Sequence, residues 1–274
     1  MTRELNNKPK IKAIFMRRQS NNFIIKDIES KKEYVFEHNP NNPWVEGELL
    51  TICVESTRKS GKHKIFLKGR VVDSTLDIKV LNITPLKLHD LGVWDPFEHY
   101  GEEAREWFPE YLDKTYHYYE MEAIDYYYDE MPDFDPVIYA MDLFYAGKED
   151  KAKRELGAFL CKDWRYLDGH NHLGLMEERV GRYEKMRKHY ELAVKIGSLT
   201  VNKNLKRIIL PWSIIENRPF LRALHGYGLS LAHLGLKDEA LEIFEWCYGI
   251  CPMDNLGVRF LIDALKHGKD IFEL

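Results

Sequence analysis

One pattern recurs three times in the C-terminal half of the chain and restricts the possible folds more than any other feature. In each copy an apolar stretch ends at a glycine, and a charged segment with spaced apolar residues follows. The glycines are Gly147, Gly181 and Gly235; the first two lie 34 positions apart and the last two lie 54 apart. A period near 34 is typical of stacked pairs of antiparallel helices. The wider spacing indicates an insert at about residues 200–220.

The residues around each glycine fit two packed helices. Small residues occur on the first helix of each copy, where the second must approach closely: Ala140, Gly174 and Gly228. The glycine itself can adopt the left-handed conformation that closes the first helix. Large apolar residues then occur on the second helix: Leu156, Tyr190 and Phe244. We therefore expect three helical hairpins within residues 133–274, followed by a C-terminal capping helix, because stacked repeats need a closed end.

These features resemble the tetratricopeptide repeat (TPR) family over residues 133–254. The third unit matches most closely. The first departs from the family pattern at Pro136, in its opening turn, and the second at Met186, where a small residue is usual. The resemblance implies an α-α superhelix of about three TPR-like units that binds a protein or peptide in its concave face.

The whole chain also resembles an uncharacterised family of bacterial cytoplasmic proteins. Its members combine a small N-terminal β domain, TPR units and a Leu-Pro-Trp…Asn-Arg-Pro-Phe segment. The corresponding residues here are Leu210–Trp212 and Asn217–Phe220. This second resemblance implies an architecture and no activity.

Residues 1–95 have the pattern of a small antiparallel β barrel. Five short runs rich in β-branched and aromatic residues are separated by turn sequences; the runs cover residues 11–17, 21–29, 32–37, 47–56 and 63–73. Residues from Leu81 to Asp95 show no clear period, so we expect them to cross to the next domain.

Residues 96–132 form an acidic, tyrosine-rich segment that we expect to be a helical connector. The spacing of Trp107 and Tyr111 fits one helix, and the spacing of Tyr119 and Tyr126 fits a second.

Composition favours a folded, cytoplasmic protein. Hydrophobic residues make up 45% of the chain and charged residues 31%, which excludes a disordered chain. No apolar run is long enough for a membrane helix, and the polar start predicts no secretion signal. The four cysteines are too few for a disulfide framework in a chain of this length.

The first helix of each hairpin is expected to line the concave face. Projecting a helical period onto the sequence places these candidate binding residues there: Phe144, Tyr145, Asn171, Glu178, Arg179, Arg222 and His225. The face would change from aromatic to polar along its length, which suits an extended peptide or a helix with a hydrophobic anchor. Alternatively, the acidic segment 96–130 fills it from within the chain.

A second candidate site lies at the insert and the last hairpin. Its polar residues are Asn217, Arg218, Asp254, Asn255 and Arg259, with His225 shared, and the insert also contains the candidate Trp212. The arginines could hold a carboxylate or phosphate in a bidentate fashion. A network that caps helix ends is the structural alternative, and Trp212 and Ile215 could simply plug a gap between units two and three.

The segment 58–70 is basic and could contact nucleic-acid phosphates. Its cations are Arg58, Lys59, Lys62, His63, Lys64, Lys68 and Arg70. Only Phe66 is near for base stacking, so docking on the acidic segment 96–130 of the same chain is favoured over nucleic-acid binding.

No metal or cofactor site is predicted. His170 and His172 are two apart, so on a helix they point in different directions. Cys247 and Cys251 share a helix face but occupy packing positions. Phosphate-binding glycine loops, nucleophile elbows and zinc-protease motifs are absent from the sequence.

Three hypotheses result. The first is a protein-interaction module that acts as a scaffold or adaptor. The second is a nucleic-acid-associated protein that uses the basic hairpin. The third is an enzyme with a pocket near residues 210–220.

Overall fold

A computed structural model describes residues 9–19, 22–38, 42–61, 64–124 and 134–273. The chain divides into two compact units. Unit 1 comprises residues 1–84 and 125–192, and unit 2 comprises residues 85–124 and 193–274. Compactness is not independent folding, so the three predicted domain ranges stay predictions.

Unit 1 begins with the expected barrel. Its strands are β1 (Lys10–Gln19), β2 (Asn22–Asp27), β3 (Glu33–Glu37), β4 (Leu49–Ser60) and β5 (Lys64–Thr75). They close in the order β1-β2-β3-β5-β4. The expectation that all pairs are antiparallel was wrong, because β3 and β5 are parallel. This follows from the order: β4 runs opposite to β1, and β5 runs opposite to β4, so β5 has the direction of β3.

Strand β1 is buried on both faces. Alternate residues of a strand point to opposite sides, and Ala13 and Phe15 lie in the barrel interior. Ile14 and Met16 lie outside, in a cluster that includes Leu81 of the short helix η1 (Ile78–Leu81). Cys161 and Trp164 of the helical part pack against the same cluster. The barrel of unit 1 therefore shares a hydrophobic core with the helices of that unit.

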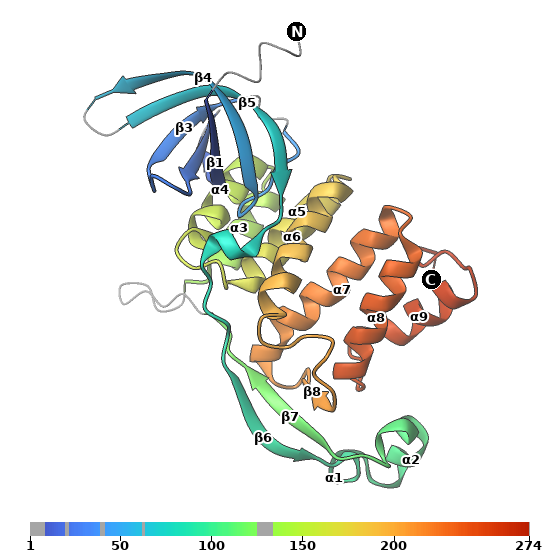
Figure 1. The fold of residues 1–274 in the computed structure, drawn as a ribbon. Helices are drawn as coiled ribbons and strands as arrows, with labels where there is room; N and C mark the ends of the chain where they lie inside the picture. The colour runs from blue at the N-terminus through green and yellow to red at the C-terminus, as the bar shows by residue number, and fades with distance from the viewer. Residues whose placement is uncertain (1–8, 20–21, 39–41, 62–63, 125–133, 274) are drawn as a thin grey trace. The chain divides into compact units, whose positions relative to one another are not determined.

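The three predicted helical hairpins and the capping helix are present (Figure 1). The helices are α3 (Pro136–Tyr145), α4 (Glu149–Leu160), α5 (Leu167–Arg179), α6 (Tyr183–Gly197), α7 (Arg218–His233), α8 (Lys237–Ile250) and α9 (Val258–Lys266). Their turn glycines have φ values of 72° at Gly147, 71° at Gly181 and 77° at Gly235. The left-handed closure predicted from the sequence is thus confirmed. None of the helices in the described residues has the length and apolarity needed to cross a bilayer.

Small residues let the helices of each hairpin approach closely, as expected. A Cβ added to Gly228 would lie 2.4 Å from Phe244, and one added to Gly174 would lie 2.7 Å from Tyr190. Ala140 is fully buried.

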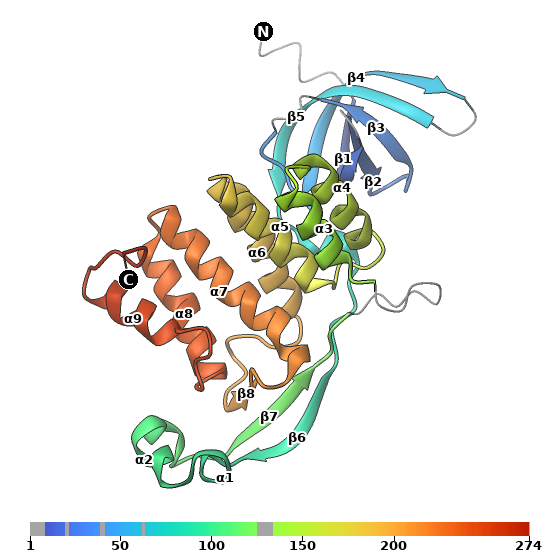
Figure 2. The same ribbon diagram turned by 180° about the vertical axis from the view of Figure 1, so that it is seen from behind.

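Unit 2 contains a three-stranded sheet where the sequence predicted a helix through Tyr119 and an irregular segment before Asp95. Its strands are β6 (Leu88–Trp94), β7 (Tyr116–Met121) and β8 (Ile208–Ile209). The helix expected through Tyr119 was wrong, and the segment before Asp95 forms β6 rather than a simple crossing. Tyr116 and Tyr118 both pack against the cluster that contains Trp94. Residues two apart therefore share a face, as in a strand, and tyrosine favours strands, so this segment is a strand and not the predicted helix. β6 and β7 form a long ribbon (Figures 1 and 2).

Short helices follow β6: α1 (Pro96–Tyr100), η2 (Gly101–Glu103), α2 (Ala104–Trp107) and η3 (Pro109–Tyr111). They bury Phe108 and Tyr111 against Trp94. The helix expected through Trp107 and Tyr111 is therefore broken into short turns.

The insert supplies strand β8 and the short helix η4 (Ile215–Asn217). Val201 and Leu210 are buried, and Trp212 is half-buried. Ile215 is 65% exposed, so the expectation that it plugs a gap was wrong. β8, and not Ile215, connects the insert to the sheet of unit 2 by pairing with β7.

Candidate functional site

Helix α3 presents the aromatic end of the predicted binding face. Tyr145 is 68% exposed and Ile138 is 61% exposed. Phe144 is half-buried, and its ring centre lies 5.9 Å from that of Tyr145. Since Ile138 and Tyr145 are seven positions apart, they share one side of the helix. This side exposes two large apolar side chains to solvent, together with the carboxylate of Asp142, four positions after Ile138.

The predicted residues of α5 have mixed environments. Asn171 is buried, and its Nδ2 donates to Oδ1 of Asp168 at 3.1 Å. Glu178 is half-buried, and burial raises the pKa of its carboxyl group. Arg179 is exposed. Of the three, Arg179 is the most accessible to a partner.

In unit 2 two arginines lie beside Trp212. The Arg218 guanidinium lies 5.2 Å from the centre of the Trp212 ring, and that of Arg222 lies 5.6 Å from it. Nε of Arg218 also donates to the carbonyl of Trp212 at 2.9 Å. These cation–π contacts orient both arginines on the insert.

Asn217 is fully buried and connects three segments of unit 2. Its Oδ1 accepts from the backbone N–H of Met121 at 2.8 Å. Its Nδ2 donates to the carbonyls of Tyr119 and Pro211 at 2.9 and 3.1 Å. The amide of Asn217 thus joins the insert to β7, and it does not cap the end of α7 as the structural alternative expected.

The remaining polar candidates of unit 2 do not converge on Asn217. The Asp254 carboxylate accepts from the backbone N–H groups of Val258 and Arg259, so it caps α9. Arg259 lies 3.6 Å from Asp254, and Asn255 is exposed. His225 packs near Phe244, and burial lowers its pKa to about 4.

The β4–β5 hairpin is basic and exposed at Lys59, Lys64, Lys68 and Arg70. Arg58 is paired with Glu37 at 2.6 Å and lies over the Phe66 ring. Lys62 and His63 lie outside the described residues, as do residues 125–130 of the acidic segment. Residues 58–70 belong to unit 1 and residues 96–124 to unit 2, so the predicted docking of the basic segment on the acidic one stays a prediction.

The two histidines of α5 do not form a metal site. His170 is fully buried, whereas Nδ1 of His172 lies 2.8 Å from the carbonyl of Asp168. Across the described part of the chain, no three metal-ligating side chains are grouped. The cysteines there are free thiols, and Cys247 and Cys251 are buried as expected.

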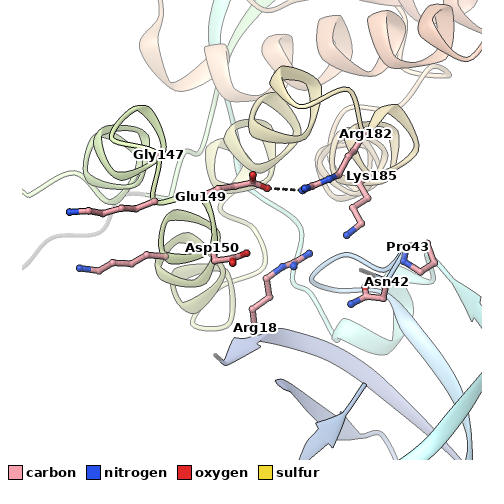
Figure 3. A pocket seen from close by; sticks show the side chains of 10 residues that line it. Arg18, Asn42, Pro43, Gly147, Glu149, Asp150, Arg182 and Lys185 are labelled. Atoms are coloured by element: carbon pink, nitrogen blue, oxygen red, sulfur yellow. Dashed lines mark hydrogen bonds and ion pairs between the residues drawn. The ribbon is translucent and has the colours of Figure 1, made fainter. Parts of the chain in front are cut away.

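Unit 1 contains a polar pocket that the sequence analysis missed (Figure 3). It has a volume of about 1010 Å³ and lies between the barrel and two helical hairpins. Its lining residues come from β1, the loop before β4, the α3–α4 turn, the first turn of α4, the α5–α6 turn and the start of α6: Arg18, Asn42, Pro43, Gly147, Lys148, Glu149, Asp150, Lys151, Arg182 and Lys185. Five of these are cationic and two are anionic.

Two of the lining residues, Glu149 and Arg182, belong to a closed ring of four ion pairs. The Glu149 carboxylate accepts from Arg182 at 2.6 Å and from Lys153 at 2.8 Å. Glu177 lies 2.7 Å from Lys153 and 3.2 Å from Arg182. Burial alone would raise the pKa of Glu149, but the hydrogen bonds from Lys153 and Arg182 outweigh it and lower that pKa. Two cations thus balance two carboxylates.

Arg18 and Lys185 lie outside this balanced ring, and both extend into the pocket (Figure 3). The nearest carboxylate to Arg18 is that of Glu46, whose Oε1 lies 3.8 Å from Nε. Burial raises the pKa of Glu46, and the charge of Arg18 opposes this rise. Burial and the charge of Arg18 lower the pKa of Lys185 to about 8. The two cations are therefore close enough to repel each other.

Two buried histidines lie behind the pocket. The rings of His170 and His189 are 6.2 Å apart, and Nε2 of His189 lies 3.9 Å from Glu46. Burial lowers the pKa of His170 to about 3 and that of His189 well below its ordinary value. Both rings are therefore neutral near pH 7, and they do not compensate Glu46.

A repeat signal could have found part of this pocket. Lys148 and Lys151 follow Gly147 at the same distances as Arg182 and Lys185 follow Gly181. Equivalent turns of adjacent hairpins thus present equivalent cations. Arg18 gives no such signal, because only the packing of α4 on β1 brings it there.

A buried ion pair fixes the barrel loop beside the pocket. Nζ of Lys188 lies 2.8 Å from Glu48 and donates to the carbonyl of Pro43 at 2.9 Å.

Comparison with known proteins gives no family-model match and no match among curated proteins.

Proposed function

We propose that the helical hairpins are TPR units and that the chain is an interaction module that binds a protein partner. The exposure of two large apolar side chains on one side of α3, Ile138 and Tyr145, is the observation that supports this most directly. Exposed apolar side chains grouped on one helix face are typical of a site that receives a partner. A hydrophobic segment of a partner protein is the occupant that this face fits.

Aromatic residues give the α3 face the composition of an interaction site. Tyr139 is 36% exposed and lies close to Ile138 in sequence. Tyrosine is enriched at interfaces because its ring buries a large area and its hydroxyl stays hydrated. Arg179, on the next first helix, adds an exposed cation.

Affinity purification with the full chain tests this proposal. We expect the double variant Ile138→Ser/Tyr145→Ser to lose at least one partner that the wild type retains, and purified partner to bind it at least tenfold more weakly. The variant Phe260→Ser is the control, because Phe260 is a 58% exposed apolar residue on α9. Identical partners and affinities for wild type and the α3 variant would contradict the proposal.

The basic β4–β5 hairpin favours a second candidate function, binding of nucleic acid. Small five-stranded barrels of the OB class bind oligonucleotides partly through the loop between strands 4 and 5, although this is analogy at the level of fold. The exposed Lys59 and Lys64 carry the charge needed. A gel-shift titration at low salt should show binding that Lys59→Gln/Lys64→Gln weakens and added salt abolishes; no shift at low salt would remove this candidate.

A further inference from the structure

The pocket of unit 1 has an excess of positive charge that its own carboxylates do not balance. Lys148, Lys151 and Lys185 line it together with Arg18 and Arg182. Arg182 is neutralised within the ion-pair ring described above. The other lining carboxylate, Asp150, is exposed at the edge. The lining residues as a group therefore attract anions.

Arg18 and Lys185 are the central pair of this excess. The Arg18 side chain is only 12% exposed, and its Nε is buried with no hydrogen-bond acceptor among the described residues. Lys185 is 8% exposed, and no described carboxylate lies within ion-pair distance of it. The Glu46 carboxylate, 3.8 Å from Nε of Arg18, offsets one of the two positive charges. Holding the other cation away from water is costly unless a further opposite charge joins it. An anionic ligand in the pocket would supply that charge.

The start of α4 also borders the pocket, where its first backbone N–H groups lie beside the carboxylates of Glu149 and Asp150. Lys148 is the N-cap residue of this 12-residue helix, and no side chain caps it. The first N–H groups of a helix have no acceptor within the helix, and the helix dipole places partial positive charge there. Backbone N–H groups and cationic side chains thus border the same pocket.

We infer that this pocket binds a small molecule that carries phosphate groups, with Arg18 and Lys185 as its principal ligands. Helix N-termini and the planar fork of arginine both suit phosphate oxygens. A volume of about 1010 Å³ exceeds the space that one phosphate needs, so it has room for a diphosphate or for a larger group attached to the phosphate. This site is independent of the α3 face, so either proposal can fail alone.

Isothermal titration of the full chain with pyrophosphate tests the inference. We expect saturable binding that Arg18→Gln and Lys185→Gln each weaken at least tenfold. Lys64→Gln is the matched control, because it removes the same charge from the exposed β4–β5 hairpin and should bind like wild type. Citrate should bind at least tenfold more weakly than pyrophosphate.

Three results would overturn the inference: no saturable binding by the wild type, wild-type affinity for pyrophosphate in both pocket variants, or equal wild-type affinities for citrate and pyrophosphate. Circular dichroism checks that each variant is folded. Lys151→Gln, at an exposed position on the pocket edge, provides a second pocket variant if Arg18→Gln unfolds the chain, and it should weaken binding at least twofold.

The pH dependence of binding tests Lys185 itself. The groups that act on it are Arg18 of β1, Lys153 of α4, Glu177 of α5 and Glu46 of the barrel loop. With a pKa near 8, Lys185 loses its proton as pH rises from 7 to 9. The ratio of wild-type affinity to Lys185→Arg affinity should therefore fall over this range, and the titration of pyrophosphate cancels in the ratio. A constant ratio would contradict the role of Lys185.

Discussion

Gly228 and Gly249 lie on facing helices of one hairpin but have different surroundings. A Cβ on Gly228 would lie 2.4 Å from Phe244, whereas one on Gly249 would meet nothing within 4 Å. The same substitution should therefore have opposite effects at the two positions. Gly228 therefore reports on the steric need for glycine, and Gly249 reports on the cost of glycine's backbone flexibility in a helix.

We predict that Gly228→Ala lowers the free energy of unfolding by about 1–3 kcal/mol, because overpacking forces Phe244 to move. Gly249→Ala should be neutral or raise it by up to about 1 kcal/mol, because alanine favours helix. Urea denaturation of both variants measures the difference. Equal effects would show that the close packing of α7 on α8 does not require glycine.

His170 is a residue whose burial makes stability depend on pH. Its pKa is about 6.5 in an unfolded chain and about 3 in the fold. A lowered pKa means that the unfolded state takes up the proton first, so stability is complete above pH 6.5 and declines as pH falls from 6.5 towards 3.

We predict that the wild type loses about 1–1.5 kcal/mol through His170 between pH 7.5 and pH 5.5. The variant His170→Phe, which cannot take up a proton, should lose less over the same range. Urea denaturation at the two pH values measures both. A wild-type profile no steeper than that of the variant would show that His170 is not responsible.

At the scale of elements, helices α4 and α5 and the turn before α6 meet around the ion-pair ring of unit 1. Lys153 is 2% exposed and contacts both Glu149 and Glu177. Glu177 is 1% exposed, so it cannot regain water if Lys153 is lost. Breaking a buried pair costs far more than its net contribution when intact.

We predict that Lys153→Met lowers the free energy of unfolding by about 3–5 kcal/mol, because it leaves a buried carboxylate undercompensated. Lys151→Met, on the same helix but exposed, should change it by less than about 0.5 kcal/mol. The double variant Lys153→Met/Glu177→Leu should recover part of the loss. Thermal and urea unfolding measure all three, and no recovery would argue against an electrostatic cause.

At the scale of the whole molecule, free thiols report on both compact units. Cys53 and Cys161 belong to unit 1, and Cys247 and Cys251 belong to unit 2. Burial raises the pKa of Cys161 and of Cys251 to about 12. Since the thiolate is the reactive form, folded chains should react slowly with thiol reagents.

We predict slow alkylation of all four cysteines in native buffer and rapid alkylation in concentrated urea. Mass spectrometry of the labelled peptides at intermediate urea concentrations measures the extent of alkylation at each cysteine, and hence the unfolding of each unit. If the units unfold together, the four labelling curves should coincide. Rapid labelling of Cys161 or Cys251 in native buffer would contradict their burial.

Local patterns were sufficient for the helical hairpins and for the number of barrel strands. The left-handed turn at Gly147 and the contact of Gly228 with Phe244 depend on residues close in sequence. The residues of the two candidate sites could be predicted only in part from such patterns. Tyr145 is exposed as a helical period suggests, but Asn217 is buried, because its amide pairs with β7, which a helical period could not anticipate.

Tertiary structure alone decided the rest. The tyrosine-rich segment became β7 because it has partners on both sides, β6 and β8, which come from distant parts of the sequence. The polar pocket depends on Arg18 meeting Lys185, which lies far along the chain. Their charges and pKa values result from burial and from each other's field, and neither exists before the barrel and the hairpins pack. The repeating glycines therefore predicted the helices, while only the folded chain brought together the cations of the pocket.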